Sequence, residues 1–305
     1  FQALFANTTG SNNTAVGLQS IYYNTTGQKN VGVGNNTLGG GGASGSFSSN
    51  TAVGFNALLD VTTGSNNVAI GTCALESNTT ANENVAVGRL SMGLNTTGTF
   101  NVAVGNYSLD ANTTGDCNVS MGYSSLSANT TADNNTAVGF KSLIANTTGT
   151  PNVAVGNFSL CSNTTGASNT GVGFCALKNN TEGDSNTGFG RSALQINATG
   201  NNNTALGRNA LANNTASDNT AVGSCSLQTN TTGGSNVAVG TNSLLSNTTG
   251  AANVAIGRNA GDAITTGSCN VAIGFGSLTN NIVGTSNVAI GRDTLASSTV
   301  STNVA

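Results

Sequence analysis

The sequence predicts an all-β parallel β-solenoid, or β-roll, of about seventeen coils with 17 residues each. Three observations predict it: a short motif recurs at constant spacing, apolar residues within the motif alternate with period two, and the composition is unlike that of a globular domain. Only 6% of the 305 residues are charged, 42 are glycine, and Trp and His are absent, whereas typical soluble domains carry about 25% charged residues. We therefore expect residues 1–305 to form one repeat array.

The period comes from a marker motif, Asn-(Thr/Val)-Ala-Val-Gly, whose glycine recurs throughout the chain. This marker glycine occupies positions 17, 34, 54, 71, 88, 105, 122, 139, 156, 173, 190, 207, 223, 240, 257, 274 and 291. Fourteen of the sixteen intervals are 17 residues, one is 20 and one is 16. Such constancy indicates that each unit forms one structurally equivalent coil.

The residues before each marker glycine indicate a short β-strand, because Val or Thr, then Ala, then Val alternate with the period of a strand. We expect the two larger side chains to face the interior and the Ala column to face outward. A Leu four residues after the glycine, as in Leu109 and Leu160, supplies a second interior wall. The marker glycine itself is expected at a tight corner with positive φ.

An asparagine stands four residues before every marker glycine, and we call this set the strand Asn column. Stacked amides can bond to the coils above and below, so we expect a structural Asn ladder. The column comprises Asn13, Asn30, Asn50, Asn67, Asn84, Asn101, Asn118, Asn135, Asn152, Asn169, Asn186, Asn203, Asn219, Asn236, Asn253, Asn270 and Asn287.

A second segment, Asn-Thr-Thr-Gly, recurs in phase with the marker, and we call its first position the Asn-Thr-Thr column. It is typical of a turn, and it also contains the acceptor pattern for N-glycosylation, which belongs on exposed loops. The candidate glycosylation sites are Asn7, Asn24, Asn78, Asn95, Asn112, Asn129, Asn146, Asn163, Asn197, Asn230 and Asn247. Where Val61 and Ile264 replace the Asn, Thr-Thr-Gly persists, which favours the plain turn.

One unit is longer than the others. Between Gly34 and Gly54 it gains three residues, and residues 39–46 read Gly-Gly-Gly-Gly-Ala-Ser-Gly-Ser. Glycine and serine in such a run form flexible chain, so we expect a tolerated loop insertion on one face of the solenoid.

The residue inventory argues against an enzyme. Without His the usual general base is missing, and the scattered carboxylates do not recur in one column as a catalytic pair. We expect Asp110, Asp116, Asp133 and Asp184 to be solvated turn residues. No calcium-roll motif is present, so we expect no catalytic residue, no metal site and no cofactor. With no basic stripe and no long apolar run, neither nucleic-acid binding nor membrane insertion is expected.

The six cysteines do not form the pattern of a disulfide framework. Three of them, Cys73, Cys175 and Cys225, share a column but lie at least three coils apart, too far for a bridge that needs Cα atoms within about 7 Å. Cys161 and Cys175 lie in adjacent coils and are the one pair worth considering. Free thiols standing in for Ser or Ala are the expected state.

Arginine recurs one residue after the marker glycine, at Arg89, Arg191, Arg208, Arg258 and Arg292. This strip is expected to face outward, either as isolated solvated charges or as a contact for a neighbouring solenoid or an anionic glycan. Aromatic residues near this strip, Tyr107, Tyr123 and Phe140, leave open a glycan-binding surface.

Four units match a known repeat most closely: residues 67–71, 253–257, 270–274 and 287–291 all read Asn-Val-Ala-Ile-Gly. This core resembles the head repeats of trimeric autotransporter adhesins of the YadA type. The resemblance implies a left-handed parallel β-roll, usually trimeric, that is displayed on a cell or virus surface and used for attachment. That family has a shorter period and lacks the Asn-Thr-Thr-Gly segment. The motif is also similar to the rolls of some plant ice-binding proteins.

We expect a structural subunit of an extracellular filament or fibre, such as a surface appendage or a viral fibre shaft, with an adhesive role. Its expected partners are copies of itself, head to tail or laterally and as a trimer, and surface glycans. No polar capping coil is visible at either end, which favours a longer chain or end-to-end stacking. The alternative is an ice-binding or glycan-binding protein with a repetitive surface. Only one outward Thr column is expected from adjacent threonines, which counts against ice binding.

Overall fold

The computed structural model describes residues 2–42, 45–297 and 301–305, and it confirms the predicted all-β parallel solenoid. These residues form seventeen three-residue strands and no helix, so no helical segment in them could cross a bilayer. The chain divides into two compact units, Phe1–Asn152 and Val153–Ala305, and each is described by itself.

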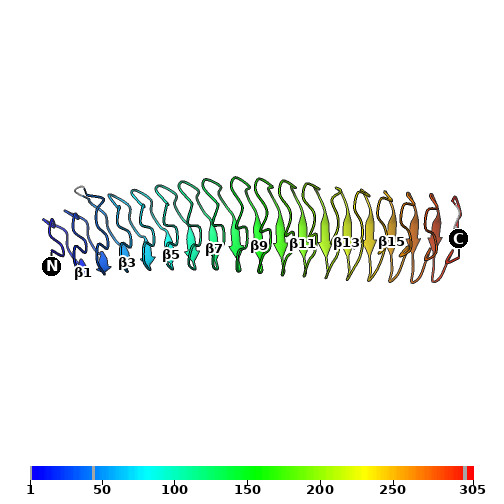
Figure 1. Cartoon of the computed structure of the whole chain (residues 1–305), viewed down its shortest axis with the longest axis horizontal. Coiled ribbons are helices and arrows are strands. Elements are labelled where there is room, and N and C mark those ends of the chain that lie inside the picture. Colours follow the sequence, from blue (N-terminus) through cyan, green and yellow to red (C-terminus); the bar gives the residue numbers. More distant parts are fainter. Residues whose placement is uncertain (1, 43–44, 298–300) are drawn as a thin grey trace. The chain divides into compact units, whose positions relative to one another are not determined.

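Each unit is a stack of coils that contribute one strand apiece (Figure 1). Unit 1 contains β1 (Thr14–Val16), β2 (Val31–Val33), β3 (Thr51–Val53), β4 (Val68–Ile70), β5 (Val85–Val87), β6 (Val102–Val104), β7 (Val119–Met121) and β8 (Thr136–Val138). Unit 2 contains β9 (Val153–Val155), β10 (Thr170–Val172), β11 (Thr187–Phe189), β12 (Thr204–Leu206), β13 (Thr220–Val222), β14 (Val237–Val239), β15 (Val254–Ile256), β16 (Val271–Ile273) and β17 (Val288–Ile290).

Consecutive strands within each unit pair in parallel and without any shift in register. In β4 and β5, for example, Val68 pairs with Val85 and Ala69 pairs with Ala86. Every column of the repeat therefore stacks on itself at the spacing of paired strands, about 4.8 Å.

The prediction of which strand residues face inward was wrong. The central residue, which is Ala, Gly or Ser, is buried in every strand except β1, where Ala15 is half-buried. Ala69, Ala103 and Ala255 are fully inaccessible, while the flanking residues are half-buried or exposed. The interior is only one coil wide, and at the central strand position it has no room for a larger side chain. At Gly32, which replaces Ala in β2, an added Cβ would already lie 2.6 Å from Ser20 Oγ and 2.9 Å from Ile21 Cγ1.

The opposite wall of the interior is the predicted Leu column, which is fully buried at Leu58, Leu109 and Leu244. These leucines adopt left-handed backbone conformations, with φ of 54° at Leu109 and 48° at Leu244. That conformation costs roughly 1–2 kcal/mol for a residue with a Cβ, and complete burial of a Leu side chain contributes roughly 1.5–3 kcal/mol in return. The buried Leu thus offsets its own backbone strain.

The marker glycine has positive φ, as predicted, and it also permits close approach of neighbouring coils. Gly105 has a φ of 135°, and an added Cβ would lie 2.5 Å from the carbonyl oxygen of Gly122. Any side chain at this corner would separate the two coils.

The insertion begins with Gly39, and residues 43–44 within the predicted segment 39–46 lie outside the described residues. Gly40, Gly41 and Gly42 all have positive φ. Phe47, which follows the insertion, is fully buried and contributes the bulkiest side chain of the described interior.

Candidate interaction surface

The strand Asn column forms a continuous buried ladder within each unit, and each member supports the next coil. The backbone N–H of Asn118 donates to Oδ1 of Asn101 at 2.9 Å, and Nδ2 of Asn118 donates to the same oxygen at 3.2 Å. Nδ2 of Asn101 donates to the carbonyl oxygen of Gly115 at 2.8 Å. The Asn side chain therefore takes the place of a backbone partner at a point where the coil turns.

The Asn-Thr-Thr column is also inside the solenoid, so the exposed position expected for its asparagines was wrong. The candidate glycosylation sites Asn24, Asn78, Asn95, Asn112, Asn129, Asn146, Asn163, Asn197, Asn230 and Asn247 are fully buried, and Asn7 is partly buried. Nδ2 of Asn112 donates to Oδ1 of Asn95 at 2.8 Å and to the carbonyl oxygen of Gly115 at 3.0 Å. The folded coil leaves no room for a sugar on these nitrogens.

The two threonines that follow each such Asn point in different directions. The first is partly buried in most coils and exposed in a few, such as at Thr130 and Thr231. It bonds to the next coil, as where Thr96 Oγ1 donates to the carbonyl oxygen of Thr113 at 3.0 Å. The second, as at Thr97 and Thr114, is exposed. This segment therefore presents one freely exposed Thr column, in agreement with the geometry expected for adjacent residues.

The aspartates expected as solvated turn residues also connect coils. Oδ1 of Asp116 accepts from the N–H of Thr99 at 2.6 Å, and Oδ1 of Asp133 accepts from the N–H of Asp116 at 2.7 Å. Oδ1 of Asp184 accepts from the N–H of Ala167 at 2.7 Å. Asp110 is partly buried, and this burial raises the pKa of its carboxyl group above the ordinary value.

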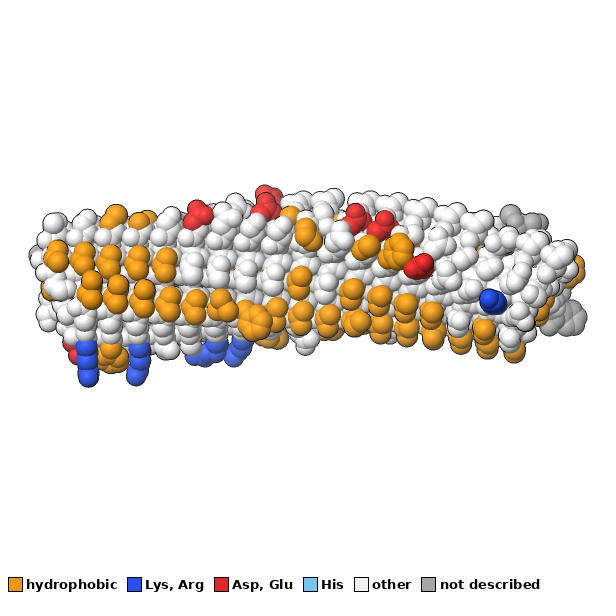
Figure 2. All heavy atoms as spheres, turned by 180° about the vertical axis from the view of Figure 1, so that it is seen from behind, with side chains coloured by type: hydrophobic (Ala, Val, Ile, Leu, Met, Phe, Trp, Pro, Cys, Tyr) orange, Lys and Arg blue, Asp and Glu red, His pale blue; other side chains and the backbone are white. Residues whose placement is uncertain are grey.

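The most extensive surface feature is the outer side of the strands, which we call the strand face. It consists of the first and third residues of every strand, all of which are Thr, Val, Ile, Leu, Met or Phe. Val104 and Ile256 expose 38% and 40% of their surface. Figure 2 shows apolar side chains in rows along each unit, with most charged side chains beside these rows. The strand face is therefore flat, regular and free of charge.

Beside the strand face runs the predicted Arg strip, which is exposed at all five positions. In unit 1, Nη1 of Arg89 donates to the hydroxyl of Tyr107 at 2.6 Å, and the ring of Tyr123 lies edge-on to Tyr107 and stacked on Phe140. In unit 2, the guanidinium groups of Arg258 and Arg292 lie 5.8 and 5.4 Å from the centre of the Phe275 ring. These cation–π contacts hold the strip in an ordered arrangement.

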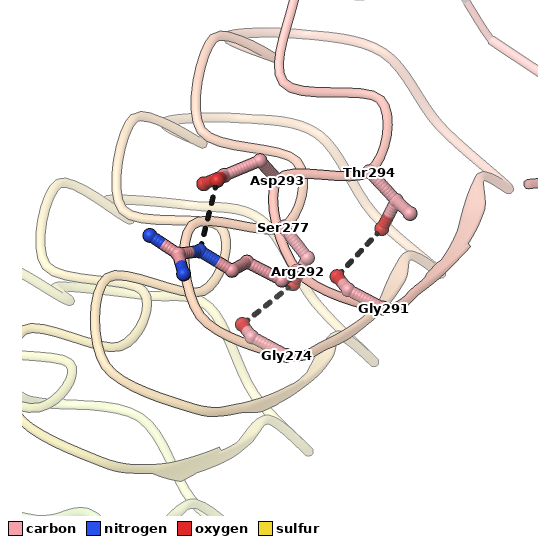
Figure 3. A network of polar contacts seen from close by, with 6 residues as sticks. All are labelled: Gly274, Ser277, Gly291, Arg292, Asp293 and Thr294. Atoms are coloured by element: carbon pink, nitrogen blue, oxygen red, sulfur yellow. Dashed lines mark hydrogen bonds and ion pairs between the residues drawn. The ribbon is translucent and has the colours of Figure 1, made fainter.

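Figure 3 shows how the last described coils of unit 2 form this corner. Nε of Arg292 pairs with Oδ2 of Asp293 at 3.3 Å, and both side chains are exposed. Behind them, Oγ1 of Thr294 donates to the carbonyl oxygen of Gly291 at 2.9 Å, and Oγ of Ser277 bonds likewise to Gly274. The corner is held from within by hydroxyl groups, and the Arg292–Asp293 ion pair lies on its exposed side.

All six cysteines, Cys73, Cys117, Cys161, Cys175, Cys225 and Cys269, are free thiols. The pair considered from the sequence, Cys161 and Cys175, is unbridged. Burial and the neighbouring carboxylate of Glu76 raise the pKa of the Cys73 thiol to about 11, which disfavours the reactive thiolate. Among the described residues no three acidic or cysteine side chains are grouped to hold a metal ion.

Comparison with models of known protein families finds no match, and comparison with curated proteins finds no significant match.

Proposed function

We propose that the chain is a structural subunit of an extracellular fibre or appendage, in which solenoids associate side by side through their strand faces. The observation that carries this proposal is the strand face itself. An exposed, mainly apolar surface of this regularity marks an interaction site in a water-soluble protein, and no charged side chain of the strand face would have to be desolvated on association.

The partner we propose is a second copy of the same chain. A surface that repeats at every coil is matched best by a surface with the same repeat, and another solenoid of this sequence supplies it. Stacked β-sheets pack about 10 Å apart with interdigitated side chains. The resemblance of the Asn-Val-Ala-Ile-Gly core to YadA-type head repeats supports display on a cell or virion surface and a trimeric arrangement.

An adhesive role belongs to the same proposal. The ordered strip of Arg89, Tyr107, Tyr123 and Phe140 lies beside the strand face and remains available when strand faces pair. Aromatic rings and guanidinium groups together suit a glycan surface.

The test is sedimentation velocity of the wild-type chain and of a double variant, Val104→Asp with Ile256→Asp, which places one charge on the strand face of each unit. We expect the wild type to sediment as an oligomer and the variant as a folded monomer, because buried unpaired carboxylates oppose association. A matched control, Thr114→Asp with Thr249→Asp, puts the same charges on exposed turn residues and should remain oligomeric. A monomeric wild type, or a strand-face variant that still assembles, would contradict the proposal.

Ice binding is the second candidate, because the strand face presents Thr and Val in register at one-strand spacing. Thr occupies the first strand position in only seven of the seventeen strands, at Thr14, Thr51, Thr136, Thr170, Thr187, Thr204 and Thr220. This mixed column is less regular than an ice lattice requires. Thermal hysteresis of the monomeric variant and of the wild type would test this alternative directly.

A further inference from the structure

A pocket lies beside the insertion in unit 1, where the chain departs from the regular repeat. It has a volume of about 330 Å³, and its lining includes Gln19, Tyr22, Tyr23, Gly39, Leu59 and Asp60. These residues come from three consecutive coils. The volume lies at the small end of the range of roughly 300–1,000 Å³ for small-molecule sites.

The pocket exists because the middle coil lacks side chains where its neighbours carry large ones. Tyr22 and Tyr23 stand five and six residues after their marker glycine, and Leu59 and Asp60 stand at the same positions two coils later. The coil between them has Gly39 and Gly40 there. The missing side chains leave a hollow between a wall of tyrosines and a wall that ends in a carboxylate.

Contacts between aromatic rings fix the positions of the tyrosines in the unliganded pocket. The ring of Tyr22 stacks on Phe5 with centroids 5.0 Å apart, and Tyr23 meets Tyr22 edge-on at 4.6 Å. Ordered rings of this kind offer apolar faces to a ligand without a large loss of side-chain entropy.

Most polar side chains of the pocket are free to bond to a ligand; the exception is Asn36, which also lines the pocket and whose Nδ2 donates to Oδ1 of Asn56 at 3.3 Å. Within the described residues, the amide of Gln19, the hydroxyls of Tyr22 and Tyr23 and the carboxylate of Asp60 form no side-chain hydrogen bond. Together they supply several donors and acceptors around an aromatic wall. No lining residue is basic, and Glu76 lies close enough to Asp60 for charge repulsion.

We propose that this pocket binds a neutral saccharide of one or two rings, with a sugar face against the tyrosines and its hydroxyl groups on Asp60 and Gln19. A hydroxyl donating to a carboxylate is a strong, charge-assisted hydrogen bond. The negative charge of the pocket disfavours acidic sugars. This proposal does not depend on association through the strand face, since the pocket lies within one unit of one chain.

The test is saturation-transfer NMR of the full chain with the methyl glycosides of glucose, galactose, mannose, N-acetylglucosamine and glucuronic acid as probes. We expect transfer to at least one neutral glycoside and none to the glucuronide. Asp60→Asn should weaken binding by about tenfold or more, because it removes a hydrogen bond to a charged group. Tyr23→Ala should also weaken it.

The control is Phe100→Ala, which removes an exposed aromatic ring of the same unit that belongs neither to the pocket nor to the Arg strip, and it should leave binding unchanged. Circular dichroism of each variant would establish that the solenoid is intact, and Tyr23→Phe provides a milder change at the same position. The proposal is overturned if no neutral glycoside receives saturation, if the glucuronide alone does, or if folded Asp60→Asn and Tyr23→Phe variants both bind as the wild type does.

Discussion

The strand Asn column and the Asn-Thr-Thr column run through the same coils, yet they tolerate replacement differently. Every coil keeps the first, whereas the second is replaced by Val61 and Ile264. In the strand column, Oδ1 of Asn101 accepts from the backbone N–H of Asn118. In the other column, the N–H of Asn112 already bonds to the carbonyl oxygen of Leu109 in its own coil. An Asn whose Oδ1 accepts the backbone N–H of the next coil is therefore indispensable, whereas an Asn whose amide donates to a carbonyl oxygen that has a second donor is not.

The two columns also meet at a shared acceptor. The carbonyl oxygen of Gly115 receives Nδ2 of Asn101 at 2.8 Å and Nδ2 of Asn112 at 3.0 Å. Loss of Asn112 consequently leaves this carbonyl bonded, while the backbone N–H of Asn118 has no such reserve when Asn101 is lost. Replacement of an Asn should therefore destabilise the solenoid by different amounts in the two columns.

Asn101→Val should lower the free energy of unfolding by about 3 kcal/mol. The change orphans the buried N–H of Asn118, and a buried unsatisfied backbone group costs roughly 1–3 kcal/mol in addition to the hydrogen bonds lost. Urea denaturation followed by circular dichroism measures it. The explanation of the invariant column is refuted if this variant is as stable as the wild type.

Asn112→Val should lower the free energy of unfolding by about 1 kcal/mol, because the carbonyl oxygen of Gly115 keeps its hydrogen bond from Asn101 and an apolar side chain is gained in the interior. Val61 shows that a coil accommodates this residue at the same position. The same urea titration applies, with Asn101→Val as the matched partner. If both variants lost the same free energy of unfolding, the proposed difference between the two Asn columns would be wrong.

Gly261→Leu combined with Ile264→Asn should raise the free energy of unfolding by about 1 kcal/mol. Ile264 interrupts its column, and the buried Oδ1 of Asn247 and Nδ2 of Asn281 on either side of it have no partner. Restoring Asn satisfies both, and Leu refills the space that Ile264 occupies beside Gly261.

The two changes at this coil are coupled. An added Cβ at Gly261 would lie 3.0 Å from Cδ1 of Ile264, so Gly261→Leu alone should be destabilising. Thermal denaturation of the two single variants and the double variant gives the coupling energy. Additive effects of the two substitutions would show that Gly261 and Ile264 do not act together in place of the Leu and Asn that other coils carry at these positions.

The sequence was sufficient to predict the strands, the marker corner and the Leu wall, because these depend on constant spacing and backbone requirements. The alternation alone did not show which strand side chains face the interior, since Val-Ala-Val is compatible with either Val or Ala pointing inward. The size of the side chains found in each column would have indicated the direction. The position of Ala103 never holds more than Ala or Ser, whereas the position of Val104 also accepts Met121 and Phe189. Only the interior of a one-coil-wide solenoid imposes such a limit.

The burial of the Asn-Thr-Thr column was missed because Asn, Thr and Gly are typical of exposed turns. Its replacement by Val61 and Ile264 is the signal of an interior position, since an exposed turn gives no advantage to β-branched apolar residues. The left-handed backbone at the leucines could not be foreseen, because local preference disfavours it and burial overrides that preference. The pocket beside the insertion depends on which coils become neighbours in space, and a flexible Gly-rich run does not reveal that.

The most direct test of the proposed function is electron cryo-microscopy of the wild-type assembly at a resolution that separates β-strands. We predict solenoids side by side with their strand faces opposed and about 10 Å apart, as in packed β-sheets. Solenoids whose strand faces are all exposed to solvent, whether isolated or joined through another surface, would contradict the account.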